Sequence, residues 1–240
     1  MATHKGAVLL KFCAIFILTL FAFEGKAYAQ VSGSVTLVSD YSYRGISLSD
    51  GQAVPQLNLV YDSPDGWYAG AFGSKVRVYS WTSDGEQILL YSGLSRRLGL
   101  ASGMIWEAGV TGSLFPNATS LNYGEIFTGI MMDNLSARIY YSPDYIGLSM
   151  KSLYLEANAD YALHERIDVF SHIGWLTYPD AKAGQVANNR LDARIGFGVN
   201  FSSWKLQLAY GTTKQRHTYS AVRYQSPARS NLVFSASYLF

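Results

Sequence analysis

Apolar and polar residues alternate along most of this chain from Gln30 onward. In the segment 190–201, Leu191, Ile195 and Phe197 share one face with other apolar residues, while charged residues and glycines occupy the opposite face. The segment 151–163 is divided in the same way. A period of two residues is typical of a β-strand whose two faces meet different environments. The pattern therefore predicts an all-β protein.

About twelve such segments follow one another, and the connections between them alternate in length. The segments are 31–44, 54–62, 67–78, 86–97, 103–115, 123–132, 134–142, 150–162, 167–178, 190–201, 204–211 and 231–240. Short connections alternating with long ones are typical of an up-and-down transmembrane β-barrel, with tight turns at one rim and loops at the other. Three segments, 86–97, 123–132 and 134–142, alternate poorly. The sequence therefore predicts an antiparallel barrel of twelve strands, with a ten-stranded barrel as the alternative.

The content of the two faces distinguishes a membrane barrel from a soluble sandwich or a lipocalin-like barrel, since all three alternate. The polar face is rich in glycine, serine, asparagine and opposed charges, and the apolar face carries aromatic residues near the strand ends. These aromatic residues are Tyr41, Tyr43, Tyr61, Trp106, Tyr141, Tyr161, Trp175, Phe201, Trp204, Tyr210 and Tyr238. Amphipathic rings at strand ends suit the two headgroup levels of a bilayer. We therefore expect the apolar face to meet lipid.

The N-terminal residues have the pattern of an export signal. His4, Lys5 and Lys11 precede an apolar run over 12–23, and Ala27-Tyr28-Ala29 fits the cleavage rule of signal peptidase. The run is too short for a spanning helix, which needs about 20 residues. We predict a cleaved signal peptide over 1–29 and an exported barrel over 30–240.

Composition excludes several classes of protein. Hydrophobic residues make up 49% and charged residues 15% of the 240 residues, so the chain is not disordered. The formal net charge of +2 gives no basic excess for nucleic acid, which we exclude as a partner. The only cysteine, Cys13, lies in the predicted signal peptide, so the exported part has neither disulfides nor a thiol nucleophile.

The last segment, 231–240, ends on an aromatic residue. Phe234, Tyr238 and Phe240 share one face of it. This arrangement looks like the C-terminal signal that the outer-membrane assembly machinery reads in bacterial barrel proteins. The strand is also needed for closure, because an open edge would expose unsatisfied backbone groups to lipid.

A family resemblance appears near the start of the barrel. The stretch 37–47, LVSDYSYRGIS, is followed by Ser49-Asp50-Gly51, Pro55, the run 66–70 and Gly73-Ser74. This sequence resembles the opening of the TorF-type porin family, most strongly over about residues 33–76. It departs from that pattern at Leu48, where members often have Gln, and at Phe72, where a Trp is common. The resemblance implies an outer-membrane porin with no defined solute.

Charges on the polar face are candidates for lining the barrel. Following the strands alternately outward and inward places a mostly basic set in the outer half: Arg44, Lys75, Arg77, Arg138, Arg190 and Arg194, with Asp40 and Asp192. The periplasmic half receives Asp62, Glu107, Glu156, Asp160 and Asp168, with Lys205. Charged rings set ion preference in a narrow pore, so we predict weak anion preference at the outer mouth. Alternatively, these charges pair across strands and fill the barrel.

The geometry of the barrel and its longest predicted loop affect which solutes could pass through the lumen. Twelve strands leave a lumen of about 10 Å, which Phe127, Tyr140, Tyr154 or an inward loop could narrow. The predicted loop 212–230 carries basic residues and no acidic one: Lys214, Arg216, His217, Arg223 and Arg229. Guanidinium groups bind phosphate through two parallel hydrogen bonds, so this loop could bind lipopolysaccharide or recruit anionic solutes. A merely solvated basic loop is the alternative.

Residues for catalysis are scarce in the predicted barrel. It holds His164, His172 and His217, and Asp168 lies about 13 Å along a strand from His172, too far for a hydrogen bond. No nucleophile elbow, phosphate loop, dinucleotide fingerprint or zinc-protease helix is present. We therefore predict a non-enzymatic outer-membrane porin for small polar solutes, with no cofactor and no metal. Its other expected partners are outer-membrane lipids. A closed structural or ligand-binding barrel acting through its outer loops is the alternative.

Overall fold

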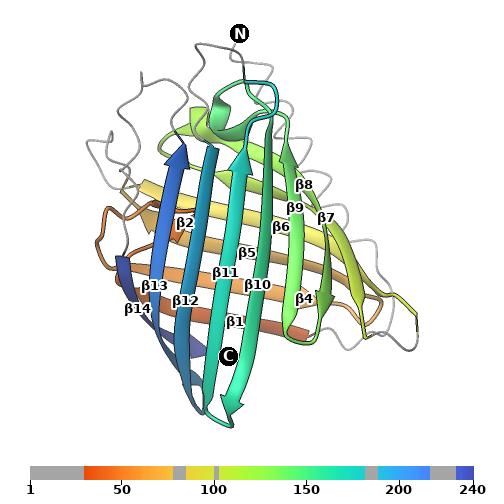
Figure 1. The fold of residues 1–240 in the computed structure, drawn as a ribbon, viewed down its shortest axis with the longest axis vertical. Coiled ribbons are helices and arrows are strands. Elements are labelled where there is room, and N and C mark those ends of the chain that lie inside the picture. Colours follow the sequence, from red (N-terminus) through yellow and green to blue (C-terminus); the bar gives the residue numbers. More distant parts are fainter. Residues whose placement is uncertain (1–29, 78–84, 100–102, 182–188, 217–230) are drawn as a thin grey trace.

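Twelve antiparallel strands close into a barrel in the computed structural model, which describes residues 30–77, 85–99, 103–181, 189–216 and 231–240 (Figure 1). The barrel strands are β1 (Gln30–Val38), β4 (Val54–Asp62), β5 (Trp67–Val76), β6 (Gly85–Arg97), β7 (Ile105–Leu114), β8 (Tyr123–Met132), β9 (Leu135–Ser142), β10 (Ser152–His164), β11 (Ile167–Thr177), β12 (Asn189–Phe201), β13 (Trp204–Arg216) and β14 (Asn231–Leu239). Each strand pairs with its neighbour in the sequence, and β1 pairs with β14 to complete the ring. The prediction of twelve strands is confirmed, including the three that alternate poorly in sequence.

Short and long connections separate onto two rims, as the sequence predicted. We call the edge with the connections 63–66, 98–104, 133–134, 165–166 and 202–203 the turn rim, and the opposite edge the loop rim. Both Gln30 and Phe240 belong to the turn rim. Two short 3-10 helices, Thr119–Leu121 and Tyr145–Gly147, lie in connections of the loop rim. Among the described residues, no helix is long and apolar enough to cross a membrane.

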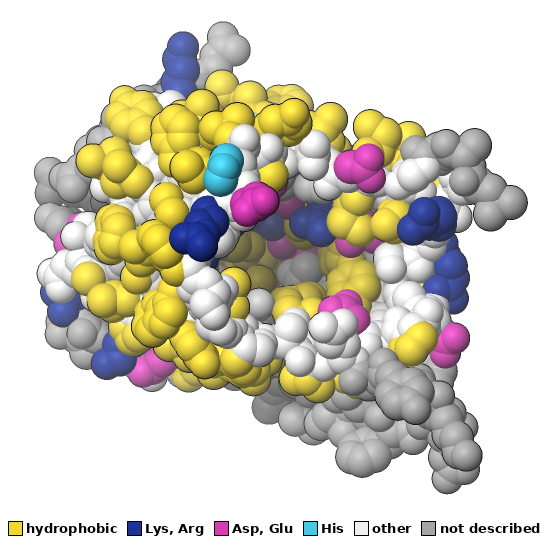
Figure 2. Space-filling view, turned by 90° about the horizontal axis from the view of Figure 1, so that it is seen from below, with side chains coloured by type: hydrophobic (Ala, Val, Ile, Leu, Met, Phe, Trp, Pro, Cys, Tyr) yellow, Lys and Arg dark blue, Asp and Glu magenta, His cyan; other side chains and the backbone are white. Residues whose placement is uncertain are grey.

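The outer wall carries the apolar residues of the alternating strands. Ile195 and Phe197 are 54% and 56% exposed, whereas the neighbouring Gly196 and Gly198 are buried. Figure 2 shows hydrophobic side chains around the outside and charged ones beside a central hollow. Most predicted girdle residues are also exposed: Trp106, Tyr161, Trp175, Phe201, Trp204, Tyr210 and Tyr238. A closed barrel with an apolar exterior suits contact with lipid.

The first predicted segment, 31–44, is corrected by the structure, because its strand ends at Val38. Tyr41 and Tyr43, expected among the outward girdle residues, instead turn inward, and Tyr41 is buried. The chain then makes a separate hairpin of β2 (Ser42–Tyr43) and β3 (Ile46–Ser47). Its turn contains Arg44 and Gly45, both with positive φ. We call residues 39–51 the plug hairpin.

Closure of the ring uses the two ends of the described barrel. The amide of Gly33 donates to the carbonyl of Phe240 at 2.8 Å, and the amide of Phe240 donates back at 3.0 Å. Phe234, Tyr238 and Phe240 all point outward and are exposed. Their predicted role as an assembly signal stays a prediction, as does the signal peptide, which lies outside the described residues.

Candidate channel interior

A cavity of about 1630 Å³ occupies the inside of the barrel. Its lining reaches from the plug hairpin to residues of the turn rim such as Arg97 and Asp133. Phe127, Tyr140 and Tyr154 line it, as predicted, and form a row of neighbouring rings with centroids 5.4 Å and 6.1 Å apart. The cavity therefore combines aromatic faces with polar and charged groups.

The plug hairpin is held in its own shape by Asp40. One carboxylate oxygen accepts hydrogen bonds from the hydroxyl of Ser49 at 3.0 Å, the amide of Gly51 at 3.2 Å and the hydroxyl of Ser47. The other oxygen accepts from the side-chain amide of Asn231 on β14 at 2.9 Å. Asp40 thus organises the hairpin and ties it to the strand beside β1.

Arg44 fixes the tip of the hairpin to the far wall. Its two terminal nitrogens donate to the two oxygens of Glu125 at 2.8 Å and 2.7 Å, and the side chains of both residues are almost completely buried. Glu125 lies on β8, nearly opposite β1 in the ring. The guanidinium also lies 4.3 Å from the ring centroid of Tyr154 and 5.1 Å from that of Tyr140. Bidentate pairing and ring contacts are the strong interactions of arginine, so the tip is firmly anchored.

Two further bonds hold the backbone of the hairpin tip to a third part of the wall. Arg190 on β12 donates to the carbonyl of Arg44 at 3.0 Å, and Thr213 on β13 donates to the carbonyl of Gly45 at 3.0 Å. A Cβ at Gly45 would lie 2.7 Å from Asp192 Cβ, so this close approach requires glycine, as does its positive φ. The hairpin is consequently attached to strands on several sides of the barrel and narrows the interior.

A tyrosine next to the tip completes this packing. Tyr123 on β8 donates its hydroxyl to that of Tyr43 at 3.1 Å. Burial raises the pKa of the Tyr43 hydroxyl, so the group stays neutral beside Arg44 and Glu125. Glu125 therefore carries the negative charge that balances Arg44, and the neighbouring Tyr43 does not contribute one.

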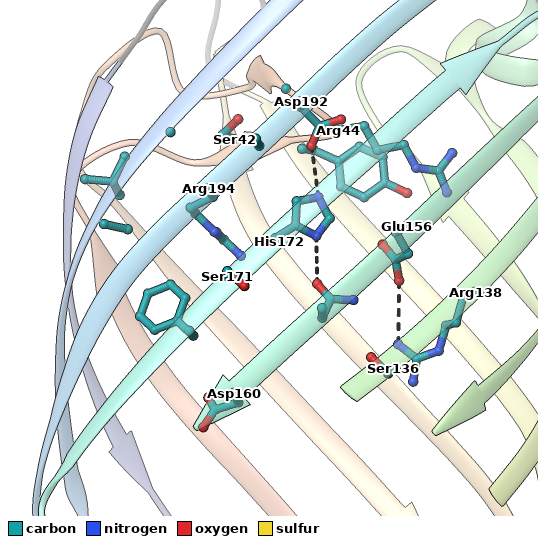
Figure 3. Close-up of a pocket in the computed structure, with 18 of the residues that line it drawn as sticks. Ser42, Arg44, Ser136, Arg138, Glu156, Asp160, Ser171, His172, Asp192 and Arg194 are labelled. Atoms are coloured by element: carbon teal, nitrogen blue, oxygen red, sulfur yellow. Dashed lines mark hydrogen bonds and ion pairs between the residues drawn. The ribbon is translucent and has the colours of Figure 1, made fainter. Parts of the chain in front are cut away.

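Arg138 connects two carboxylates farther along the wall. Its Nε donates to Glu107, and its Nη1 lies 3.6 Å from Glu156 (Figure 3). Tyr68 also donates to Glu107 at 2.8 Å. Because Glu156 pairs in register with Arg138 and lies in the loop-rim half of β10, the predicted division into a basic and an acidic half is wrong here. Lateral pairing, the alternative weighed from the sequence, describes this group.

His172 faces the cavity and bonds to neighbours on both sides. Its Nε2 lies 2.9 Å from Asp192 and its Nδ1 lies 2.7 Å from Asn158 (Figure 3). The sequence excluded Asp168 as a partner of His172 by its distance along the strand. In the structure Asp168 pairs with Lys205 at 3.1 Å. The partner of His172 therefore comes from the adjacent strand.

Arg194 and Asp160 also line the cavity, as predicted. The guanidinium carbon of Arg194 lies 5.8 Å from the ring centroid of Phe170. Within the described residues, neither Arg194 nor Asp160 has an ion-pair partner. Figure 3 shows both on the cavity wall.

Several predicted site residues lie elsewhere. Lys75 is exposed and faces outward, because the neighbouring Ser74 is the inward residue and is buried. Arg77 follows the end of β5 at the loop rim. Lys214 and Arg216 belong to β13 and not to a loop. Arg223, Arg229 and His217 lie outside the described residues.

Glu125 is the functional residue that sequence reasoning missed. Its segment carries apolar residues on both faces, since Tyr123 and Phe127 point inward while Ile126 and Ile130 point outward. The single acidic residue within that segment was the available signal. No cluster of three or more potential metal ligands occurs in the part of the chain that the structure describes.

Comparisons with known proteins assign the sequence to a family and identify solved structures with a similar fold. Residues 22–240 match the model of a family described as "Bacterial protein of unknown function (Gcw_chp)". No curated protein sequence matches the chain. Among solved structures, "KdgM porin" is 11% identical with a TM-score of 0.51 and coverage of 86% of this chain and 98% of that one. A structure titled "KdgM porin in complex with disordered oligogalacturonate" is 9% identical, with a TM-score of 0.50 and coverage of 88% and 98%. At these identities the likeness shows a shared barrel fold.

Proposed function

Because the chain belongs to the Gcw_chp family of bacterial proteins, whose function is unknown, we propose its function from the barrel itself: an outer-membrane channel for small polar solutes. The observation that carries the proposal is the cavity of about 1630 Å³, lined by charged, polar and aromatic residues, inside a barrel with an apolar exterior. Water-filled interiors and lipid-facing apolar walls are the two requirements of a porin. The porin-like fold and the TorF-type resemblance support the same class.

The arrangement of the rims gives the channel an orientation. In outer-membrane barrels the tight turns face the periplasm and the long loops face the exterior. The turn rim of this barrel is then periplasmic, and the plug hairpin lies near the outer mouth. The predicted signal peptide over 1–29 and the predicted C-terminal assembly signal agree with this location.

Size selection follows from the plug hairpin. An empty twelve-stranded barrel has a lumen of about 10 Å, and the anchored hairpin occupies part of that section. The channel therefore admits solutes of the size of ions, amino acids and short oligomers rather than folded proteins.

The charges that line the cavity argue for weak cation preference. Among the described residues, seven acidic and four basic side chains line it: Asp40, Asp50, Glu125, Asp133, Glu156, Asp160 and Asp192 against Arg44, Arg97, Arg138 and Arg194. A low-dielectric wall focuses such a field on the pore. The sequence predicted weak anion preference at the outer mouth instead, because it placed six basic residues there against Asp40 and Asp192. That set included Lys75, which faces outward, and omitted Glu125, which lines the cavity. Whether the channel prefers cations or anions therefore tests whether the charges that line the cavity set its ion selectivity.

Purified, refolded protein in a planar bilayer should show discrete conductance steps, with a reversal potential of cation sign under a salt gradient. Gln207→Lys adds a cation to the cavity and should move the reversal potential toward anions. Lys75→Gln removes an outward charge and should leave it unchanged. Anion selectivity of the wild-type channel would contradict the proposed preference while leaving the channel intact.

A closed barrel that acts through its outer loops is the second candidate function. The plug hairpin favours it, because bonds to β8, β12 and β13 hold the hairpin across the interior. A bilayer that stays silent with correctly folded protein would support this alternative.

A further inference from the structure

Six charged residues that line the cavity have no ion-pair partner in the part of the chain that the structure describes: Asp40 and Asp50 in the plug hairpin, Arg97 and Asp133 at the turn rim, and the opposite charges of Arg194 on β12 and Asp160 on β10. Arg44, Arg138, His172 and Lys205 each lie against a carboxylate, at Glu125, Glu107 with Glu156, Asp192 and Asp168 respectively. Arg194 and Asp160 have no ion-pair partner within the described residues, although both line the cavity. Figure 3 shows no interaction joining either one to another drawn residue. An unpaired charge facing water in a pore is available to a solute.

The strand register places these two charges on either side of one aromatic ring. Arg194 on β12 pairs with His172, and Phe170, two residues along β11, pairs with Asp160 on β10. Two strand spacings across and two residues along separate the Cα atoms of Arg194 and Asp160 by about 12 Å. Phe170 lies on β11, the strand between them, and its ring packs over Gly196 on β12, where a Cβ would come within 2.4 Å of the ring.

The chemistry of the pair is that of a site for a dipolar solute. A guanidinium binds a carboxylate through two parallel hydrogen bonds, and a carboxylate binds an ammonium group. The face of Phe170 offers an apolar surface to whatever connects the two charged ends. The two charges cancel, so neither a simple anion nor a simple cation satisfies both.

We propose that Arg194, Phe170 and Asp160 form a binding subsite for zwitterionic short peptides passing through the channel. An extended residue spans about 3.3 to 3.6 Å, so a dipeptide or tripeptide spans about 7 to 10 Å, within the Cα separation of about 12 Å. A free amino acid is too short to reach both charges. The inference rests on the proposed channel function and names its class of solute.

Solute entry into protein-containing liposomes tests this proposal. The probes are trialanine and its doubly blocked form, acetyl-trialanine amide, which has a similar size and lacks both charges. Wild-type protein should admit trialanine about threefold faster than the blocked peptide, the effect expected from one solvent-accessible ion pair. Arg194→Gln and Asp160→Asn should each bring this ratio close to one.

Matched variants separate binding from damage to the pore. Arg194→Lys retains the charge and should keep most of the preference. The exchanged double variant R194D/D160R retains a dipolar site and should recover part of it. Bilayer conductance, measured on every variant, should show that the pore is open.

Each outcome has a distinct meaning. A wild-type channel that conducts ions but admits both peptides equally would overturn the subsite and leave the channel function standing. Unchanged ratios in both Arg194→Gln and Asp160→Asn would also overturn it. Wild-type protein that conducts nothing would instead refute the channel function.

Discussion

Replacing Glu125 by Gln should loosen the tip of the plug hairpin and raise single-channel conductance by about twofold or more, because the pore section limits flow in a narrow channel. Glu125 is the carboxylate that balances the buried guanidinium of Arg44. Removing one member of a buried pair costs about 3 to 5 kcal/mol if the other charge stays buried. Arg44 avoids that cost by moving with the hairpin into water. Bilayer recordings of Glu125→Gln against wild type measure the change.

The barrel itself should survive this substitution, since the plug hairpin is not part of the ring of twelve strands. Arg44→Ala should also raise conductance, because it removes the same anchor from the other side. Lys151→Gln is the matched control: it breaks the exposed ion pair between Lys151 and Asp180 and should change neither conductance nor stability measurably. Unaltered conductance in both Glu125→Gln and Arg44→Ala would show that the hairpin does not limit the pore.

The ring of strands could be predicted because its cause is local. Alternation along each segment reports which side meets lipid, and the lengths of the connections report which rim they occupy. Even β8 follows this rule in the structure, with Glu125 buried and Ile126 exposed. Its pattern was weak in sequence because aromatic residues on the inner face resemble lipid-facing ones.

The plug hairpin could not be predicted for the same reason. Tyr41 and Tyr43 alternate with polar residues as a strand would, and periodicity cannot distinguish lipid from an aromatic interior. The strand ends at Val38, a bend follows at Ser39 and Asp40, and the Arg44-Gly45 turn has positive φ values that the sequence merely permits. The partner of Arg44, Glu125, is distant in sequence and requires the closed ring to bring it near.

The position of each charged residue along the barrel axis also could not be predicted from the sequence. Strands of a barrel are tilted and staggered, so distance from a turn does not give depth. Glu156 was assigned to the periplasmic half by its order in the chain, yet its strand register places it level with Arg138, in the loop-rim half of β10. Partners of lumen charges, such as Asp192 for His172, follow from that register.

Arginine at two adjacent positions of β13 should have opposite consequences. Leu208 points outward near the middle of the strand, between the exposed Phe197 and Phe234 of the neighbouring strands. Leu208→Arg should lower the free energy of unfolding by about 2 to 4 kcal/mol in a bilayer, the cost of an arginine facing lipid near the midplane. Urea unfolding in lipid vesicles, followed by tryptophan fluorescence, measures this change.

Gln207→Arg is the control one residue away. Gln207 lines the cavity and pairs with Ser235 and with Gly198, over which the carboxylate of Asp168 lies. The new guanidinium would remain in water, so the stability should change by less than about 1 kcal/mol. The reverse order, with arginine tolerated at 208 and damaging at 207, would mean that the outer wall meets water, and the channel proposal would fail with the assumption of a lipid-facing exterior.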